Sequence, residues 1–157
     1  MKLKNIILGV AILFASVSFA QEHVVKVNPL GLAFGLANVG YEFSVNDSQS
    51  LTISGSYFNI ANIKGFGAGL EYRFYFDGEA IQGWHAGPSV GFFSLKDNSS
   101  NSGTVISLGG EVGHQWVFGE NFALDVFAGY SALIGGEKLL GLSGSSPTFG
   151  VSIGYAW

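Results

Sequence analysis

Cysteine is absent from the 157-residue chain, and charged residues make up only 11% of it. Without cysteine the protein forms no disulfide, no thiolate metal site and no cysteine nucleophile. Only three histidines are present, so we expect neither a histidine-rich metal site nor a cofactor. The charged fraction is well below the roughly one quarter that is usual in soluble domains, so little of the surface can be charged.

A basic cluster and a long apolar helix are also missing once the first 20 residues are set aside. Lys2 and Lys4 account for two of the seven basic residues, which leaves five against eleven acidic residues, a net charge of −6. An acidic chain without a basic cluster is a poor partner for nucleic acid. No apolar stretch long enough for a transmembrane helix follows residue 20. The rest of the chain is therefore either soluble or crosses a membrane as strands.

Residues 1–20 have the pattern of a secretory signal peptide. Lys2 and Lys4 form a positive start, residues 6–14 are apolar, and Ser18-Phe19-Ala20 resembles a small-residue cleavage site. The alternative, an N-terminal membrane anchor, is disfavoured because the apolar run is too short to span a bilayer comfortably. We expect cleavage before Gln21, leaving residues 21–157 as one domain.

From Val24 onward, apolar and polar residues alternate with a period of two, and turn residues interrupt the alternation at regular intervals. This pattern predicts an all-β protein of eight strands with no useful helix and no second domain. The weakest break is Gly35 to Ala37, and without it the first two strands merge. The predicted strands are Val24–Phe34, Asn38–Val45, Ser50–Phe58, Gly65–Phe76, Gly83–Leu95, Thr104–Phe118, Phe122–Ile134 and Thr148–Trp157.

One face of each strand is bulky and apolar, and the other carries glycine, small polar residues and a few charges. In residues 65–76, for example, Phe66, Leu70 and Phe74 alternate with Glu71 and Arg73. A soluble lipocalin-like barrel would place the bulky face inside and coat its exterior with charges, which this chain lacks. A membrane barrel does the reverse. We therefore predict an eight-stranded antiparallel up-and-down transmembrane β-barrel, closed so that its backbone hydrogen bonds are satisfied.

The connections and the aromatic residues predict an orientation. With both termini in the periplasm, the short turns at 46–49, 77–82 and 119–121 lie on the periplasmic side. The longer loops 96–103 and 135–147 then lie outside the cell, as is usual in bacterial barrels. Aromatic rings favour the headgroup level of a bilayer. We expect an outer aromatic row of Phe34, Tyr57, Phe66, Phe92 and Phe149, and a periplasmic girdle of Trp84, Trp116, Trp157, Phe43, Phe76, Phe118 and Phe122.

Two segments carry a family resemblance. Residues 26–35, Lys-Val-Asn-Pro-Leu-Gly-Leu-Ala-Phe-Gly, followed by Val39-Gly40-Tyr41-Glu42, resemble the opening of a family of small bacterial outer-membrane proteins of unknown function, frequent in Bacteroidetes-type genomes. More broadly, the chain resembles eight-stranded OmpA/OmpX-type barrels. The ending Gly154-Tyr155-Ala156-Trp157 is similar to the C-terminal signal that the barrel-assembly machinery reads, with Tyr155 and Trp157 as its aromatic residues. The resemblance implies a location in the outer membrane and contact with its lipid, and it implies no reaction.

Eight strands leave an interior that side chains nearly fill, so a wide pore is not expected. The strand alternation predicts a lumenal polar network of Glu42, Glu71, Arg73, His85, Glu111, Gln115 and Asp125. Arg73 is the only arginine, and its planar fork can hold two carboxylates, so we expect it to pair with Glu71, Glu42 or Glu111. The network is interpreted as a set of ion pairs that fills the lumen. The alternative is a narrow cation-selective channel or a small-ligand site that uses the acidic excess.

Besides the channel or ligand site, two classes of function remain open from the sequence. A structural, adhesion or surface-interaction role for a monomer is preferred, with an extracellular partner binding through loops 96–103 and 135–147. The apolar run Leu139-Leu140-Gly141-Leu142 could contact such a partner or extend the seventh strand. An enzyme that modifies lipid A is disfavoured, because His85 and His114 show no serine–histidine–acid arrangement.

Overall fold

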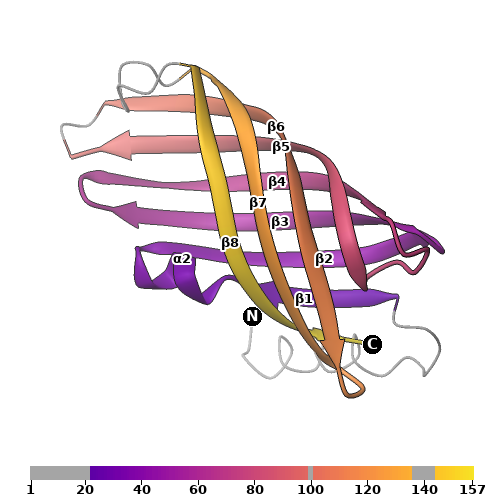
Figure 1. The fold of residues 1–157 in the computed structure, drawn as a ribbon. Coiled ribbons are helices and arrows are strands. Elements are labelled where there is room, and N and C mark those ends of the chain that lie inside the picture. Colours follow the sequence, from indigo (N-terminus) through magenta and orange to yellow (C-terminus); the bar gives the residue numbers. More distant parts are fainter. Residues whose placement is uncertain (1–21, 99–100, 136–143) are drawn as a thin grey trace, which may run out of the picture.

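The computed structural model describes residues 22–98, 101–135 and 144–157 (Figure 1). Nearly all of them form strands, and the predicted signal peptide and the run Leu139-Leu140-Gly141-Leu142 lie outside the described residues. The strands are β1 (His23–Val27), β2 (Leu36–Asn46), β3 (Gln49–Ile60), β4 (Ile63–Tyr75), β5 (Gly83–Asp97), β6 (Ser102–Phe118), β7 (Phe122–Ile134) and β8 (Gly144–Ala156). A short helix, α2 (Pro29–Ala33), lies between β1 and β2.

The eight strands form a closed barrel in which each strand pairs antiparallel with its neighbours in sequence. The last strand returns to the first, and β8 pairs with β1 from Val24 opposite Ala156 to Val27 opposite Ile153. The predicted eight-stranded antiparallel up-and-down barrel is therefore confirmed. Closure leaves no exposed sheet edge along this seam. Among the described residues, no helix is both long enough and apolar enough to cross a membrane.

The first predicted strand, Val24–Phe34, is wrong in its second half. Strand β1 ends at Val27, and Asn28 caps a helix by accepting a hydrogen bond on Oδ1 from the backbone N–H of Gly31 at 2.8 Å. Asn is a favoured cap residue and Pro29 lies in the first turn, where proline is tolerated. Gly35 then adopts a φ of 85°, which suits glycine, before β2 begins. Local capping thus overrides the alternation of residues 28–35.

The opposite error occurs at the far ends of several strands. The structure extends β3 to Ile60, β5 to Asp97, and β8 back to Gly144, all beyond the predicted bounds. Polar residues continue the hydrogen-bonded ladder there, because an antiparallel pair needs only backbone groups to propagate. The predicted loops 96–103 and 135–147 are correspondingly shorter, and 99–100 and 136–143 within them lie outside the described residues.

The barrel has two distinct ends. One, called here the turn end, holds the connections 47–48, 76–82 and 119–121 together with the start of β1 and the C-terminus. The backbone N–H groups of Glu22 and His23 both donate to the carbonyl of Trp157, at 3.0 and 3.1 Å. The other, called the loop end, holds helix α2 and the connections 61–62, 98–101 and 135–143. This is the division of connections between two ends that the sequence predicts.

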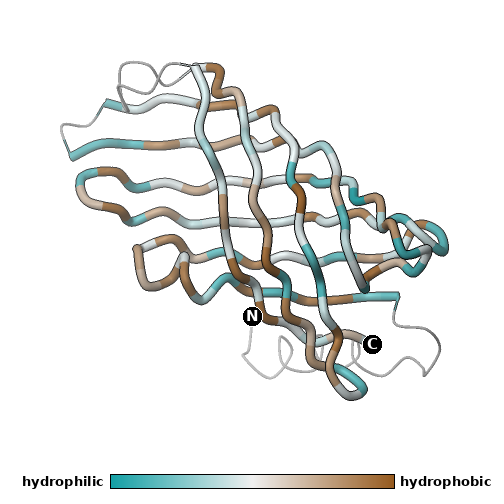
Figure 2. Tube along the Cα trace, in the orientation of Figure 1, coloured by the Kyte–Doolittle hydropathy of each residue, from teal (hydrophilic) through white to brown (hydrophobic). Residues whose placement is uncertain are grey.

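The exterior is apolar and the interior is polar. Figure 2 shows hydrophobic and hydrophilic residues alternating along the strands. On β4, Phe66 and Leu70 are exposed while Arg73 is only 3% exposed. Large apolar side chains are exposed on all eight strands, whereas the buried polar residues come from inward positions. The direction of the two faces is the one predicted for a membrane barrel.

Candidate functional site

Lys26 lies at the centre of a group of buried polar side chains in the lumen, called here the ionic cluster. Its Nζ lies 2.6 Å from Glu42 Oε2 and 3.2 Å from Asp125 Oδ2. It also donates to Gln115 Oε1 at 3.0 Å. Lysine is an ammonium with three donors, and these three acceptors, from β2, β6 and β7, match that number.

Arg73 is the second cation of the ionic cluster. Its Nη2 donates to Glu71 Oε2 and its Nη1 to Asp125 Oδ2, both at 2.8 Å. Glu42 Oε2 lies 3.5 Å from the same Nη1. Arg73 therefore contacts the predicted partners Glu71 and Glu42 and also Asp125, which was not among them. Glu111, the third predicted partner, forms no ion pair within the described part of the chain.

Ser50, Tyr75 and His85 complete the ionic cluster. Ser50 and Tyr75 donate to Glu42 Oε1 at 2.5 and 2.6 Å. The Nε2 of His85 lies 3.0 Å from Asp125 Oδ1. Buried charges are tolerated only when they are paired and hydrogen-bonded, and here each buried carboxylate has an opposite charge within 4 Å. Every strand except β8 supplies a member, so the cluster ties the barrel together across its lumen.

Glycine makes room for these side chains. Gly113 lies opposite His85 in the β5–β6 register. A Cβ at position 113 would lie 2.8 Å from the imidazole ring, which is too close for an ordinary contact. Glycines on the inner face thus leave space that the buried polar side chains occupy.

An apolar layer lies beyond the ionic cluster at the turn end and is called here the floor. The connection 76–82 turns inward, and Ile81 is fully buried against Val24, Ala123 and Ala156. Gln115 Nε2 donates to the carbonyl of Ile81 at 2.6 Å. Ile81 has a φ of 74°, an uncommon conformation for a β-branched residue. The floor and the ionic cluster thus lie at successive levels of the lumen towards the turn end.

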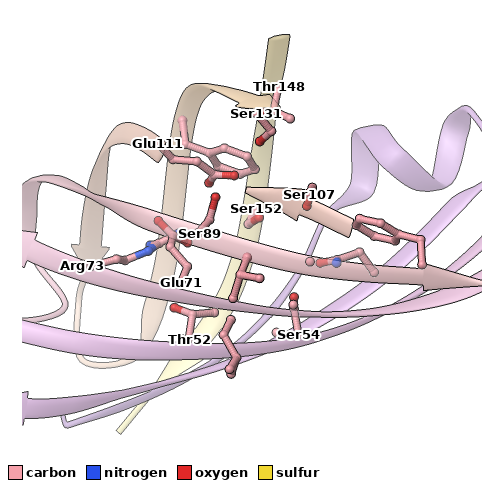
Figure 3. A pocket seen from close by; sticks show the side chains of 18 of the residues that line it. Thr52, Ser54, Glu71, Arg73, Ser89, Ser107, Glu111, Ser131, Thr148 and Ser152 are labelled. Atoms are coloured by element: carbon pink, nitrogen blue, oxygen red, sulfur yellow. The ribbon is translucent and has the colours of Figure 1, made fainter. Parts of the chain in front are cut away.

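A cavity of about 310 Å³ lies on the loop-end side of the ionic cluster and is called here the chamber. Lys26, Glu71 and Arg73 contribute to its lining together with Glu111. Its wall is rich in hydroxyl groups, as Figure 3 shows, and they come from Thr52, Ser54, Ser89, Ser107, Ser131, Thr148 and Ser152. The rings of Phe93 and Phe127 also line it.

Six of the seven residues predicted for the lumen are buried: Glu42, Glu71, Arg73, His85, Gln115 and Asp125. Glu111 is partly buried and lines the chamber. Sequence reasoning missed Lys26, although Val24 and Lys26 share one face of β1 and are both buried. In the predicted strand Val24–Phe34, Lys26 lies on the same face as Phe34, which is expected to face outward. Sequence reasoning also missed the hydroxyl groups of the chamber wall, although serine and threonine recur at every second position on the inner faces of the strands.

The residues predicted for the aromatic girdle lie near the turn end on the outside of the barrel. The centroid of the His114 ring lies 5.0 Å from that of Trp84 and 4.2 Å from that of Trp116. Phe118 and Phe122 flank the turn between β6 and β7, with centroids 6.1 Å apart. Phe43 and Phe76 lie at the corresponding ends of β2 and β4. The five residues expected in the other row, Phe34, Tyr57, Phe66, Phe92 and Phe149, are all exposed towards the loop end.

Tyr155 and Trp157 lie where the barrel closes. Their rings are 6.1 Å apart, and Trp157 also packs against His23 of β1, with centroids 5.7 Å apart. The backbone N–H of Trp157 donates to the carbonyl of His23 at 2.9 Å. The C-terminal aromatic residues are thus part of the seam between the last strand and the first.

Among the described residues, neither His85 nor His114 forms a catalytic arrangement with a serine. His85 is fully buried and bonded to Asp125, on the far side of the ionic cluster from the chamber wall. His114 is on the exterior between two tryptophans. Among the described residues, no group of three or more histidine, aspartate or glutamate side chains is arranged to hold a metal ion.

The architecture and the inverted distribution of polarity define a small β-barrel of the kind found in bacterial outer membranes. Residues 5–137 match the family described as Protein of unknown function (DUF3575), and the chain belongs to this family. The resemblance to small barrels of unknown function that the sequence motifs indicate is thereby confirmed.

Two solved structures show the same fold. Neisserial surface protein A (NspA) is 14% identical with a TM-score of 0.60, over 86% of this chain and 92% of that one. The outer membrane protein Ail of Yersinia pestis, in a phospholipid bilayer nanodisc, is 15% identical with a TM-score of 0.53, over 87% and 99%. No curated protein matches the sequence.

Proposed function

We propose that this chain is a monomeric, non-conducting barrel of a bacterial outer membrane, with a structural or surface-interaction role at its loop end. The observation that carries the proposal is the inverted distribution of side chains, with large apolar residues outside and the ionic cluster inside. Soluble monomers rarely expose an apolar patch larger than a few hundred Å², whereas a lipid-facing barrel requires a continuous apolar band. The exposed apolar side chains are stable in contact with lipid hydrocarbon.

The closed lumen favours interaction over transport. The floor and the ionic cluster occupy successive levels, so a solute that enters from the loop end meets paired charges and then an apolar layer. An ion would have to displace the partners of Lys26 and Arg73 to pass, which leaves buried charges uncompensated. A narrow cation channel, the alternative considered from the sequence, has no support in this geometry.

The loop end is the surface that a partner would reach. Helix α2 exposes Leu30 and Leu32, and Phe34 next to it is 73% exposed. Together with the loops 96–103 and 135–147, this helix gives the loop end side chains suited to contact another molecule. The solved structures with this fold include one titled a surface protein and one titled an outer membrane protein, which agrees with such a role.

Tyr155 and Trp157 are proposed to serve the assembly of the barrel. They lie at the free end of the strand that closes the barrel against β1. The barrel-assembly machinery would recognise them before the seam forms. A lipid A-modifying enzyme is not proposed, because among the described residues neither His85 nor His114 lies beside both a serine hydroxyl and an acid.

The topology is tested by inserting one short epitope tag at either of two positions in the full chain, expressed in a Gram-negative host. One insertion is in the 98–101 connection at the loop end, and the matched control is in the 119–121 turn at the turn end. We expect both variants in the outer-membrane fraction, with a gel mobility that changes on heating. Antibody should label intact cells only for the first and label the second only after permeabilisation. The reverse labelling, or recovery in the soluble fraction, would contradict the proposal.

A further inference from the structure

The chamber contains polar groups that the protein itself leaves without partners. Thr52 and Glu71 are 7% and 9% exposed, and neither Thr52 Oγ1 nor Glu71 Oε1 has a hydrogen-bond partner. Thr148 Oγ1, also on the chamber wall, is likewise unpartnered. A buried acceptor without a donor costs free energy, and a carboxylate oxygen costs more than a hydroxyl. These groups therefore favour a molecule that brings N–H or O–H donors into the chamber.

The charge of the site decides which donor fits. Lys26 and Arg73 supply two cations, whereas Glu42, Asp125, Glu71 and Glu111 supply four carboxyl groups, so the carboxyl groups outnumber the cations by two. Glu42 and Asp125 are engaged by both cations inside the ionic cluster. Glu71 uses only its Oε2 in the ion pair with Arg73, and Glu111 forms no ion pair among the described residues, so Glu71 Oε1 and the Glu111 carboxyl group are the acceptors left over. Figure 3 shows both side chains at the chamber, with Ser89 between the strands that carry them.

We propose that the chamber binds a small alkylammonium compound, with its cationic head between Glu71 and Glu111. An ammonium group has three N–H donors, and Glu71 Oε1, Thr52 Oγ1 and the Glu111 carboxylate offer three acceptors. The rings of Phe93 and Phe127 supply apolar surface for the carbon chain, and aromatic faces attract ammonium groups. A volume of about 310 Å³ is at the small end of ligand pockets and accommodates such a head with a short carbon chain.

A metal ion suits the chamber less well than an amine. Within the described part of the chain, no three histidine, aspartate or glutamate side chains converge as metal ligands. Serine and threonine hydroxyls dominate the wall instead, and they can accept hydrogen bonds from an N–H group without a fixed coordination geometry. The proposal goes beyond the role at the cell surface, because it concerns the lumen and holds whichever way the barrel is oriented.

Binding is tested on the refolded mature chain in detergent micelles by calorimetry and by amide NMR shifts. The probe is n-butylamine, and 1-butanol is its neutral counterpart. We expect butylamine to bind, with shifts at Ser89 and Ser107, and butanol to bind at least about tenfold more weakly, because a hydrogen bond to a charged group is stronger than one between neutral groups. These measurements require no membrane insertion, so a failure here is distinguishable from a failure of the topology experiment.

Variants locate the site. Glu111→Gln removes one carboxylate without breaking an ion pair of the ionic cluster, and we expect it to weaken butylamine binding about tenfold. Thr52→Val removes one acceptor with little change of shape and should also weaken binding, which gives a second test if E111Q does not refold. The matched control is Glu79→Gln, an exposed carboxylate at the turn end, which should bind as the unmodified chain does.

Four results would overturn the proposal. They are no butylamine binding, equal binding of butylamine and butanol, unchanged affinity in the refolded E111Q and T52V variants, and binding of calcium ion in place of the amine.

Discussion

Lys26 has three acceptors within 3.2 Å, from strands β2, β6 and β7, and its side chain is only 5% exposed. The hydrogen bonds join residues as far as 99 positions apart in the sequence. Removal of this one ammonium would take one of the two cations, Lys26 and Arg73, away from Glu42 and Asp125. A buried carboxylate without its partner is strongly destabilising, whereas the intact pair contributes little beyond an apolar pair of equal size.

Replacement of this lysine tests the ionic cluster. We expect Lys26→Met to lower the free energy of unfolding by about 3–5 kcal/mol, the cost of breaking a buried ion pair by removing one partner. Urea unfolding in detergent micelles, followed by tryptophan fluorescence, measures this. The matched control is Lys64→Met on an exposed position of β4, with an expected change below about 0.5 kcal/mol. Equal effects of the two variants would show that the cluster does not stabilise the barrel.

Prediction from the sequence succeeds for residues whose position depends only on the strand alternation. Glu71 and Arg73 point inward because they share a face with glycines, and a period of two fixes that face without knowledge of the fold. The pairing of Arg73 with Asp125 could not be predicted in the same way. The two residues lie on β4 and β7, which are not neighbours, and alternation gives the side of a residue but neither its depth nor what lies across the lumen.

At the scale of elements, two segments depart from simple strand pairing. Residues 28–35 form α2 and its cap instead of continuing β1, because Asn28 and Pro29 favour a helix start. Residues 76–82 look in the sequence like a polar turn, but they turn inward and form the floor with Ile81. The inward turn depends on contacts made only in the folded barrel, such as the bonds from Gln115 to Ile81 and from Ala80 to Asp47. Such contacts cannot be predicted from the local sequence.

The floor predicts how the barrel behaves as a conductor. In planar bilayers the unmodified chain should show no discrete conductance steps. On the proposed closed lumen, Arg73→Ala should also show no steps, because the floor remains, and Ile81→Gly should show none, because the ionic cluster remains. A general porin reconstituted under the same conditions verifies the sensitivity of the recording. Reproducible steps from the unmodified chain would contradict a closed lumen.

At the scale of the whole molecule, the fold and the direction of its two faces were predictable because composition and alternation act together. With 11% charged residues, the chain cannot cover a soluble exterior with charges. The closed sheet satisfies the backbone hydrogen bonds that hydrocarbon cannot. The chamber was not predictable, because its existence depends on how far the ionic cluster fills the lumen and on which rings turn inward. Phe93, for example, packs edge to face on Phe58 at 5.4 Å between centroids.

Contact of the apolar face with lipid can be tested directly with spin labels, because the sequence contains no cysteine. Single variants Leu108→Cys and Ser107→Cys place a label on adjacent residues of β6, the first on the exposed apolar face and the second on the chamber wall. In reconstituted bilayers, the label at 108 should be accessible to oxygen and protected from a water-soluble nickel complex, and the label at 107 should lack this lipid signature. A lipid signature at 107, or free access of the nickel complex at 108, would contradict the account.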